Sequence, residues 1–207
     1  MTHSDDRLFA GEIESLPDLL AAIWSNLETA AAKGKHGWHL PMIASGGTQP
    51  HVRTVVLRQA DRESRTIGCH TDVRSPKVTQ LRVTPHACWC FYDAANRVQL
   101  VAEGTASIHT DDAIAEAGWQ RSSVSSRRCY LAPAAPGSVM DEQGENLPAD
   151  LIGKLPDEAR TEVGRENFAV IRTQVQRLDF LYLTHTGNLR AEFVHEGDEF
   201  TGRWIAA

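Results

Sequence analysis

The chain has 207 residues, of which 42% are hydrophobic and 23% are charged, a composition typical of a globular protein that buries one core. Its 27 acidic and 21 basic residues give a formal net charge of -6, which argues against a nucleic-acid or anionic-membrane surface because both rely on broad positive potential. The length favours a single domain over residues 1–207.

Targeting signals are not apparent in the sequence. The stretch MTHSDDRLFAGEIE at the amino terminus is polar and acidic, and nowhere does a long run of apolar residues occur. A secretory signal or a membrane-spanning helix requires such a run. We therefore expect a cytoplasmic protein with neither a membrane nor a nucleic acid as partner.

The cysteines and histidines do not have the spacing of metal ligands. None of the four cysteines forms a C-x-x-C pair, and the nine histidines are scattered. The cysteines are Cys69, Cys88, Cys90 and Cys129. We expect reduced thiols and no metal. A hydrolase is also not indicated, because the chain has no G-x-S-x-G motif.

The first predicted elements are a helix and a β-hairpin. Residues Leu16 to Lys33 carry apolar residues at helical spacing, with Ser15 as N-cap and Pro17 in the first turn. Strands in GWHLPMIAS and VRTVVLR, joined by the turn GGTQPH, predict the hairpin.

The middle of the chain alternates strands with short helices. TIGCHT reads as a strand, and SPKVTQLRVTPH as a helix that begins with Ser75 as N-cap and Pro76 at its first position. ACWCFYD and RVQLVAEGTASIH predict two strands around the turn AAN. A helix in TDDAIAEAGWQR then has Thr110 or Asp111 as its expected cap.

The last third begins with a segment rich in Pro, Gly and acidic residues. Residues 131–150 predict a loop, either ordered or acting as a mobile flap. PDEARTEVGREN favours a short helix, and three strand-like runs follow to the end of the chain. Short strands at hairpin spacing, with no G-x-G-x-x-G or P-loop pattern, favour a mostly antiparallel barrel with peripheral helices.

Positive charge concentrates between His51 and Val78, which is unusual in an acidic chain. The helix expected after Ser75 would offer free backbone N–H groups between Arg74 and Lys77, which is the pattern of a small-anion site. The alternative is a capped surface helix with solvated cations.

Arg53 and Arg58 lie five residues apart on the expected second hairpin strand, so they point to opposite faces if that strand is regular. They would then contact different parts of one ligand, two ligands or a partner subunit. Alternatively, they are charges that protect a sheet edge from aggregation.

The runs RTVVLR, HTDVRSPKVTQL and RVQLVAEGTA resemble, in order and spacing, the FMN-binding core of the pyridoxamine 5'-phosphate oxidase-like family, especially its short branch. The resemblance extends from about Leu16 to Trp204. It implies a six-stranded antiparallel split β-barrel that is mainly β with peripheral helices. It also implies a homodimer with FMN bound at the interface.

The resemblance also assigns cofactor contacts. The strand beside the flavin, an aromatic–Thr pair, a phosphate-binding turn and a glutamine on a later strand all have counterparts here. These counterparts are Arg53, Val55, Val56, Arg58, His70, Thr71, Arg74, Ser75, Lys77 and Gln99. Pro76 departs from the family by standing where the oxidase has an arginine, and Arg74 is the candidate to replace it. His70 is the one histidine singled out as a site residue.

Substrate contacts are matched less well. A cluster of hydroxyls and arginines lies roughly where the oxidase holds its substrate phosphate, although a solvated helix end would explain it too. The cluster contains Trp119, Arg121, Ser122, Ser123, Ser126, Arg127 and Arg128, and the candidate contacts among them are Trp119, Ser123 and Arg127. Near the carboxyl end, R-x-H-D-R of the oxidase is matched only by NLRAE, in which Arg190 is the candidate contact. Leu181 stands where the family has a tryptophan.

These observations give three functional hypotheses. The first is an FMN-dependent oxidoreductase acting on a small-molecule substrate, with no side chain assigned as general base. The second is a flavin-binding carrier or sensor that performs no turnover, because the substrate residues of the oxidase are replaced. The third is a related barrel that binds haem or F420.

Overall fold

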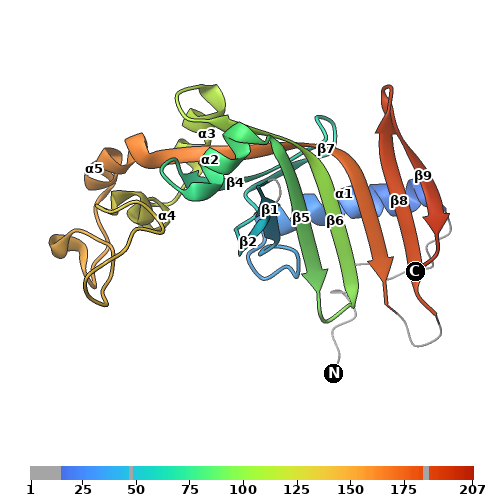
Figure 1. Cartoon of the computed structure of the whole chain (residues 1–207), viewed down its shortest axis with the longest axis horizontal. Coiled ribbons are helices and arrows are strands. Elements are labelled where there is room, and N and C mark those ends of the chain that lie inside the picture. The colour runs from blue at the N-terminus through green and yellow to red at the C-terminus, as the bar shows by residue number, and fades with distance from the viewer. Residues whose placement is uncertain (1–14, 47–48, 184–186) are drawn as a thin grey trace.

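The computed structural model describes residues 15–46, 49–183 and 187–207. These residues form one antiparallel sheet with the strand order β2-β1-β5-β6-β7-β4-β3, and β8 and β9 continue it from the other half of β7 (Figure 1). The strands are β1 (Met42–Ser45), β2 (His51–Thr54), β3 (Gln59–Asp61), β4 (Thr66–Asp72), β5 (His86–Asp93), β6 (Val98–His109), β7 (Phe168–Tyr182), β8 (Leu189–Glu196) and β9 (Glu199–Ile205).

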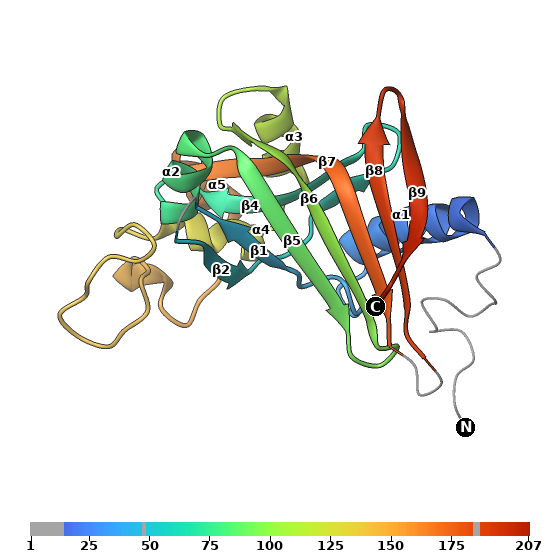
Figure 2. The same ribbon diagram turned by 45° about the vertical axis from the view of Figure 1, so that its right-hand side comes forward.

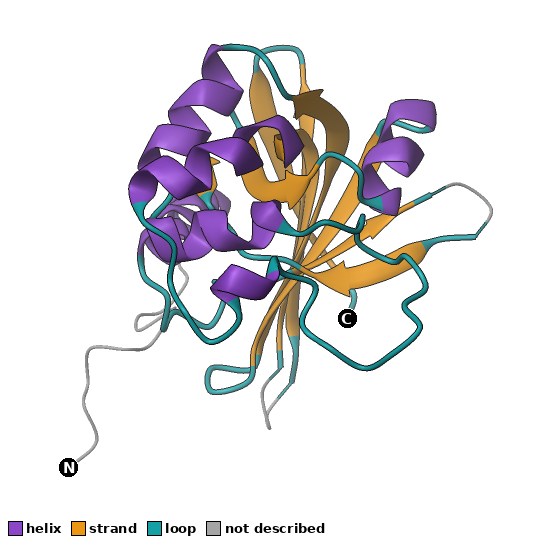
Figure 3. Ribbon diagram, turned by 90° about the vertical axis from the view of Figure 1, so that its left-hand side faces the viewer, coloured by secondary structure: helices purple, strands orange, loops and turns teal. Residues whose placement is uncertain are grey.

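The described residues thus contain nine strands, where the resemblance implied six. The expected antiparallel, mainly β architecture is confirmed. The helices are α1 (Leu16–Ala32), α2 (Pro76–Val83), α3 (Ala113–Arg121), α4 (Val124–Arg127) and α5 (Glu158–Thr161), with 3-10 turns at Arg128–Leu131, Ala149–Leu151 and Glu162–Asn167. Figure 3 shows most of the helices on one side of the strands.

Helix α1 covers the inner face of the sheet (Figure 2). Its N-cap is Ser15, whose side chain accepts from the backbone N–H of Asp18, as the sequence predicts. Leu19, Ile23 and Leu27 recur at helical spacing on one side and are fully buried in the main core. Burial of this apolar stripe therefore fixes α1 against the sheet.

The long strands β6 and β7 join the two parts of the sheet. One half of β7 pairs with β8, and the other half pairs with β4. The register of β6 and β7 shifts between Glu103 and Gly104, which marks a β-bulge. The bulge lies opposite the point at which β7 changes its pairing partner from β4 to β8, and the barrel splits at this point.

The predicted strand VRTVVLR breaks after Thr54. Val55 and Leu57 donate their backbone N–H groups to the carbonyls of Pro41 and His39, whereas Arg58 donates to Gly68 of β4. Arg53 and Arg58 therefore do not share a regular strand, so the condition of the expectation based on strand parity is not met. The segment crosses instead from the β1 side of the sheet to the β4 side.

Helices α2, α3 and α5 form where the sequence predicts them, whereas α4 was not predicted. Helix α3 begins one residue later than expected, because Asp112, rather than Thr110 or Asp111, caps it by accepting from Ile114 and Ala115. A second hydrophobic cluster lies between α3 and β7 and contains Trp119, Tyr130, Phe168 and Val170. Among the helices of the described ranges, none has the length and hydropathy of a membrane span.

The bulge allows a direct test of the fold. A Cβ on Gly104 would lie 1.9 Å from the backbone oxygen of Gln174, whereas a Cβ on Gly144 would have no heavy atom within 4 Å. We expect Gly104→Ala to lower the free energy of unfolding by about 3 kcal/mol or more, because backbone must move to relieve the clash. Urea denaturation measures this loss. Gly144→Ala is the control, and equal stability of the two variants would contradict the bulge geometry.

Candidate functional site

A cavity of about 440 Å³ opens beside the segment that follows β2 and the start of α2. We call it the β2–α2 cavity. Its lining comes from the segment after β2, from β4, from α2 and from the chain between α4 and the 131–150 loop. The lining residues are Thr54, Val55, Val56, Arg58, His70, Thr71, Asp72, Lys77, Ser125, Ser126, Cys129, Tyr130 and Pro136. Six predicted cofactor residues are therefore brought together here: Val55, Val56, Arg58, His70, Thr71 and Lys77.

Lys77 is the half-buried cation of this cavity. Its Nζ donates to Thr71 Oγ1 at 2.9 Å and to Ser75 Oγ at 2.8 Å, and no ion pair to a carboxylate forms within the described ranges. Burial lowers the pKa of Lys77, and the neighbouring positive charge of Arg53 lowers it further. An ammonium group that is desolvated and beside another cation is a receptor for an anion.

Arg53 lies behind this position without lining the cavity. Its guanidinium donates to Ser45 Oγ at 2.6 Å and to Gln80 Oε1 of α2 at 3.1 Å. Burial lowers the pKa of Arg53, and its partners are neutral oxygens. Its charge is therefore not cancelled by a carboxylate and adds to the positive potential at Lys77.

Ser75 occupies the N-cap position of α2, as predicted, but its side chain makes no capping bond. The side chain is buried and accepts from Lys77 instead. Pro76, at the first helical position, has no N–H group to offer. The turn therefore presents the lysine ammonium, rather than the serine hydroxyl, as its main donor.

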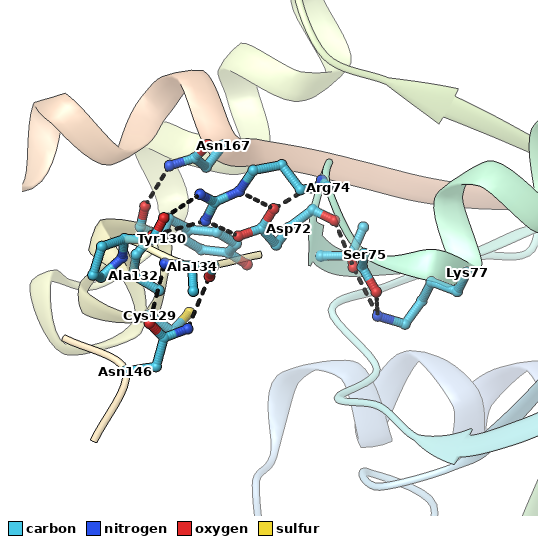
Figure 4. A network of polar contacts seen from close by, with 12 residues as sticks. Asp72, Arg74, Ser75, Lys77, Cys129, Tyr130, Ala132, Ala134, Asn146 and Asn167 are labelled. Carbon is cyan, nitrogen blue, oxygen red and sulfur yellow. Dashed lines mark hydrogen bonds and ion pairs between the residues drawn. The ribbon is translucent and has the colours of Figure 1, made fainter. Parts of the chain in front are cut away.

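Arg74 points away from Lys77, as Figure 4 shows. Its guanidinium forms two bonds to the carboxylate of Asp72, at 3.0 and 2.6 Å, and donates to the carbonyl oxygen of Ala132 at 2.9 Å. The expectation that Arg74 replaces the family's missing arginine finds no support in this geometry. Arg74 holds the start of the 131–150 loop against the end of β4.

The loop itself is ordered by further bonds. Asn146 closes it by accepting from the N–H of Ala134 and donating to the carbonyl of the same residue. Arg128 donates to the carbonyl oxygen of Leu151 at 2.7 Å. Since Pro136 of this loop lines the β2–α2 cavity, these bonds also shape the wall of the site.

His70 lines the cavity from β4 and is largely buried. Burial lowers its pKa to about 4, with smaller contributions from the charges of Arg58 and Arg121. Ser122 Oγ donates to the carbonyl of Gly118 and lies 3.3 Å from Nδ1 of His70, so it accepts the proton of that nitrogen. His70 is thus neutral at pH 7, and its Nε2 can accept a hydrogen bond.

Part of the chain matches a known family. Residues 20–110 match the family described as "Pyridoxamine 5'-phosphate oxidase, FMN-binding domain". This range contains the segment after β2, strand β4 and the start of α2. The chain is therefore similar to this family over residues 20–110.

A relative and two solved structures are similar over most of the chain. Pyridoxine/pyridoxamine 5'-phosphate oxidase 2 of Arabidopsis thaliana is 28% identical over 187 residues, covering 86% of this chain and 82% of that protein. A pyridoxamine 5'-phosphate oxidase-related FMN-binding protein from Nostoc punctiforme PCC 73102 superimposes with a TM-score of 0.71 at 22% identity, covering 93% of this chain and 100% of that one.

The second structure is PhzG from Burkholderia lata 383 in complex with tetrahydrophenazine-1-carboxylic acid, with a TM-score of 0.64 at 16% identity and 95% of each chain covered. The two structural likenesses confirm the split-barrel fold expected from the sequence.

Gln99 is a predicted flavin contact that lies outside this arrangement. It does not line the β2–α2 cavity. It lies on the outward face of the sheet, in register with Tyr92 on β5 and Leu181 on β7. Within one chain, Gln99 is therefore separate from Lys77.

Three of the four predicted substrate residues are engaged in other contacts. Trp119 is fully buried, and Arg127 packs over its ring while pairing with Glu162 at 2.8 Å. Arg190 forms two bonds with Asp179 on the outward face. These three side chains do not line the β2–α2 cavity.

Ser123 is the fourth predicted substrate residue. It caps α4 by accepting from the N–H of Ser126, and it does not line the β2–α2 cavity either.

Several lining residues were not predicted. Tyr130 and Cys129 come from the 3-10 turn after α4, and Pro136 comes from the loop. Their positions depend on Asn167, which donates to the carbonyl of Tyr130, and on Arg74. Because these partners are distant in sequence, no local pattern in the RCYL run could have identified the wall.

His70 gives a pH test of the site. Its pKa is lower in the folded protein than the ordinary 6.5, so only the unfolded chain gains this proton between pH 6.5 and about 4. Stability from this group is therefore complete above pH 6.5 and falls as the pH decreases.

We expect the wild type to lose about 2 kcal/mol more than His70→Asn in the free energy of unfolding between pH 7.5 and pH 5. Urea denaturation at both pH values measures the difference. Parallel losses in the two proteins would show that His70 is solvated.

Proposed function

We propose that the protein binds FMN in the β2–α2 cavity and acts as a flavin-dependent oxidoreductase. One observation carries the proposal: Lys77 is half-buried, bonded only to hydroxyl groups, and faces a cavity within a domain whose family is described as FMN-binding. FMN, when bound, supplies the hydride and electron chemistry of such an enzyme.

The chemistry of the lining residues fits FMN. Its phosphate is a dianion, and the charges of Lys77 and Arg53 together with the Thr71 hydroxyl supply what such a group needs. Val55 and Val56 offer an apolar wall for the ring system. A volume of about 440 Å³ lies within the usual range for cofactor sites.

The protein's own contribution would be positioning and exclusion of water. Lys77 holds the anionic end, and Tyr130 and Pro136 cover the cavity from the loop side. His70 stays neutral and presents Nε2 as an acceptor beside the site. No carboxylate is free to act as general base in this lining, because Asp72 is bonded to Arg74.

The reaction is proposed as a class rather than as oxidation of pyridoxamine phosphate. The similar protein from Arabidopsis thaliana is named an oxidase of that vitamin phosphate, which supports flavin oxidoreduction. In this chain, however, Trp119 and Arg127 are part of the core, so they are not available to hold the phosphate of that substrate.

We further propose a homodimer that completes the flavin site. The outward face of β5 to β9 has no helix packed on it in the described ranges, and it carries the exposed Tyr92 together with Gln99. The charges on this face balance, because three arginines and three carboxylates form one continuous ion-pair network. These residues are Glu103, Arg177, Asp179, Arg190, Glu192 and Arg203. A second copy could approach this face and bring its Gln99 to the cavity.

A flavin-binding carrier or sensor without turnover is the second candidate. The observation that favours it is the burial of Trp119 and Arg127, which removes two side chains from the predicted substrate position. The two candidates share FMN binding and differ in reduction of the flavin by a substrate.

Visible spectroscopy of the purified protein tests the proposal. We expect flavin absorbance after incubation with FMN and gel filtration, and a colourless protein would contradict the proposed function. Anaerobic titration with NADPH, pyridoxamine phosphate and pyridoxine phosphate then separates the candidates. Bleaching of the flavin by any of them supports an enzyme. A Soret or deazaflavin spectrum would instead indicate haem or F420.

Lys77→Met should weaken FMN binding about ten- to a hundredfold, because it removes a charge-assisted contact worth roughly 1.5–3 kcal/mol while keeping the apolar stem. Quenching of FMN fluorescence measures the dissociation constant. Arg82→Ala is the matched control, since Arg82 is an exposed cation in the last turn of the same helix. Equal affinities of the two variants would place the phosphate elsewhere.

A further inference from the structure

Three polar side chains at the end of β6 form a hydrogen-bonded chain that lies outside the flavin site. Ser107 and His109 are two residues apart on the strand and so point to the same face, and Asp112 begins α3 just beyond it (Figure 1). Ser107 Oγ lies 2.8 Å from Nε2 of His109, and Nδ1 of His109 lies 2.6 Å from Oδ2 of Asp112. These three residues do not line the β2–α2 cavity.

Asp112 is held firmly in place as the N-cap of α3. Its Oδ1 accepts from the backbone N–H groups of Ile114 and Ala115, at 3.1 and 2.9 Å, which leaves Oδ2 for His109. The bond from the N–H of Ala115 and the bond to His109 lower the pKa of Asp112, so the carboxylate is ionised at pH 7. The start of the helix therefore fixes the group that orients the imidazole.

The carboxylate of Asp112 also decides the tautomer of His109. A carboxylate only accepts hydrogen bonds, so Nδ1 of the neutral imidazole carries the proton and Nε2 keeps its lone pair. The hydroxyl of Ser107 therefore donates to Nε2. Ser107 Oγ also lies 3.3 Å from the carbonyl oxygen of Arg172, but its contact with the histidine is the shorter one. The order of the chain is thus nucleophile, base and orienting carboxylate.

The nucleophile is open to solvent, whereas the base is mostly covered. Ser107 is exposed, and the side chain of His109 is only 16% exposed. A small molecule can therefore reach Ser107 Oγ directly, while the imidazole is kept in one orientation by its two bonds. This combination is what an activated serine requires.

The backbone supplies a donor beside Ser107. The N–H of Ala106 bonds to the carbonyl of Pro85, on the β5 side of β6. Because N–H groups alternate along a strand, the N–H of Ile108 points to the same edge. The pairing of β5 with β6 ends at Thr105, so the N–H of Ile108 lies beyond that pairing. The N–H of the residue after the nucleophile is also the oxyanion donor of α/β-hydrolases.

We propose that Ser107, His109 and Asp112 form a second reactive site, which transfers acyl groups from activated esters. Ser107 Oγ attacks the carbonyl carbon of the ester while Nε2 of His109 takes the hydroxyl proton. The bond to the leaving oxygen then breaks, and that oxygen takes the proton from Nε2, so that an acyl group remains on Ser107. Water next attacks the acyl carbon and gives a proton to Nε2, and Ser107 recovers this proton as the free acid leaves.

The open position of Ser107 defines the class of substrate. An exposed hydroxyl outside the β2–α2 cavity offers little binding energy for a large molecule. The site therefore suits a small acyl group on a good leaving group, such as an aryl ester. The reaction needs only the ester and water, so it does not depend on FMN.

The test uses the full chain as purified and p-nitrophenyl acetate as the probe. We expect release of p-nitrophenolate and, after acid quenching, an acetyl group on Ser107 located by peptide mass spectrometry. Ser107→Ala should lose this label, and His109→Gln should slow acylation about a hundredfold or more, because it removes the general base. Ser25→Ala, which removes an exposed serine of α1, should react like the wild type.

Asp112 is a positioning residue, and its role in the reaction is tested apart from its capping bonds. Asparagine caps a helix about as well as aspartate, so Asp112→Asn should keep the free energy of unfolding within about 1 kcal/mol of wild type. It no longer fixes the tautomer of His109, so acylation should slow by about tenfold or more. Urea denaturation and the release of p-nitrophenolate measure the two quantities.

Two results would overturn the acyl-transfer site. One is acetylation of wild type that is no faster at Ser107 than at Ser25. The other is an equal rate of acylation in wild type and His109→Gln. If Ser107→Ala fails to fold, the comparison of Asp112→Asn with wild type still decides between the two readings. Failure of the protein to bind FMN is a separate outcome, which refutes the proposed function and leaves this test unchanged.

Discussion

The candidate site depends on a cation that has no carboxylate of its own. Lys77 is removed from water by α2 and β4, yet its ammonium is bonded only to the hydroxyls of Thr71 and Ser75. The carboxylate of Asp72, whose charge raises the pKa of Lys77, forms its ion pair with Arg74. Burying a charge in this way is costly unless an anion completes it, which is why the turn before α2 is the centre of the functional argument.

Asp72 also helps to hold the 131–150 loop, which forms one wall of the cavity. Arg74 uses Asp72 as an anchor and extends to the carbonyls of Ala132 and Pro133. The bonds of Asn146 then hold the loop closed, and Pro136 reaches the cavity. The Asp72–Arg74 ion pair therefore fixes the loop beside the cavity.

The elements of the fold could be read from the sequence because their signals are local. Ser15 and Pro17 mark the first helix, and the alternation in Val98 to His109 marks β6. The break after Thr54 could not be predicted from the sequence, because β-branched residues continue through Val56. The strand ends because the next backbone N–H groups bond to the carbonyls of Pro41 and His39, which lie before β1.

The roles of the arginines were also beyond local patterns. Motif position brought Lys77 and Thr71 together correctly, but it also placed Arg74 and Arg127 at ligands. Arg74 is paired with Asp72, two residues before it, and Arg127 is paired with Glu162, which lies 35 residues away. Arg121, which belongs to the same predicted cluster as Arg127, lines a cavity instead. Partner choice in the folded chain, rather than residue type, decides which cations remain available.

Gly118 keeps open the space between α3, His70 and Val170, which a single added methyl group would fill. A glycine within a helix costs about 1 kcal/mol relative to alanine, so α3 is less stable than its sequence could make it. What the helix gains is the room of one methyl group next to His70 and Val170. At this position a gain in helix stability would reduce the space beside the helix. Homologues that carry alanine there would have a more stable α3 and a smaller cavity beside His70 and Val170.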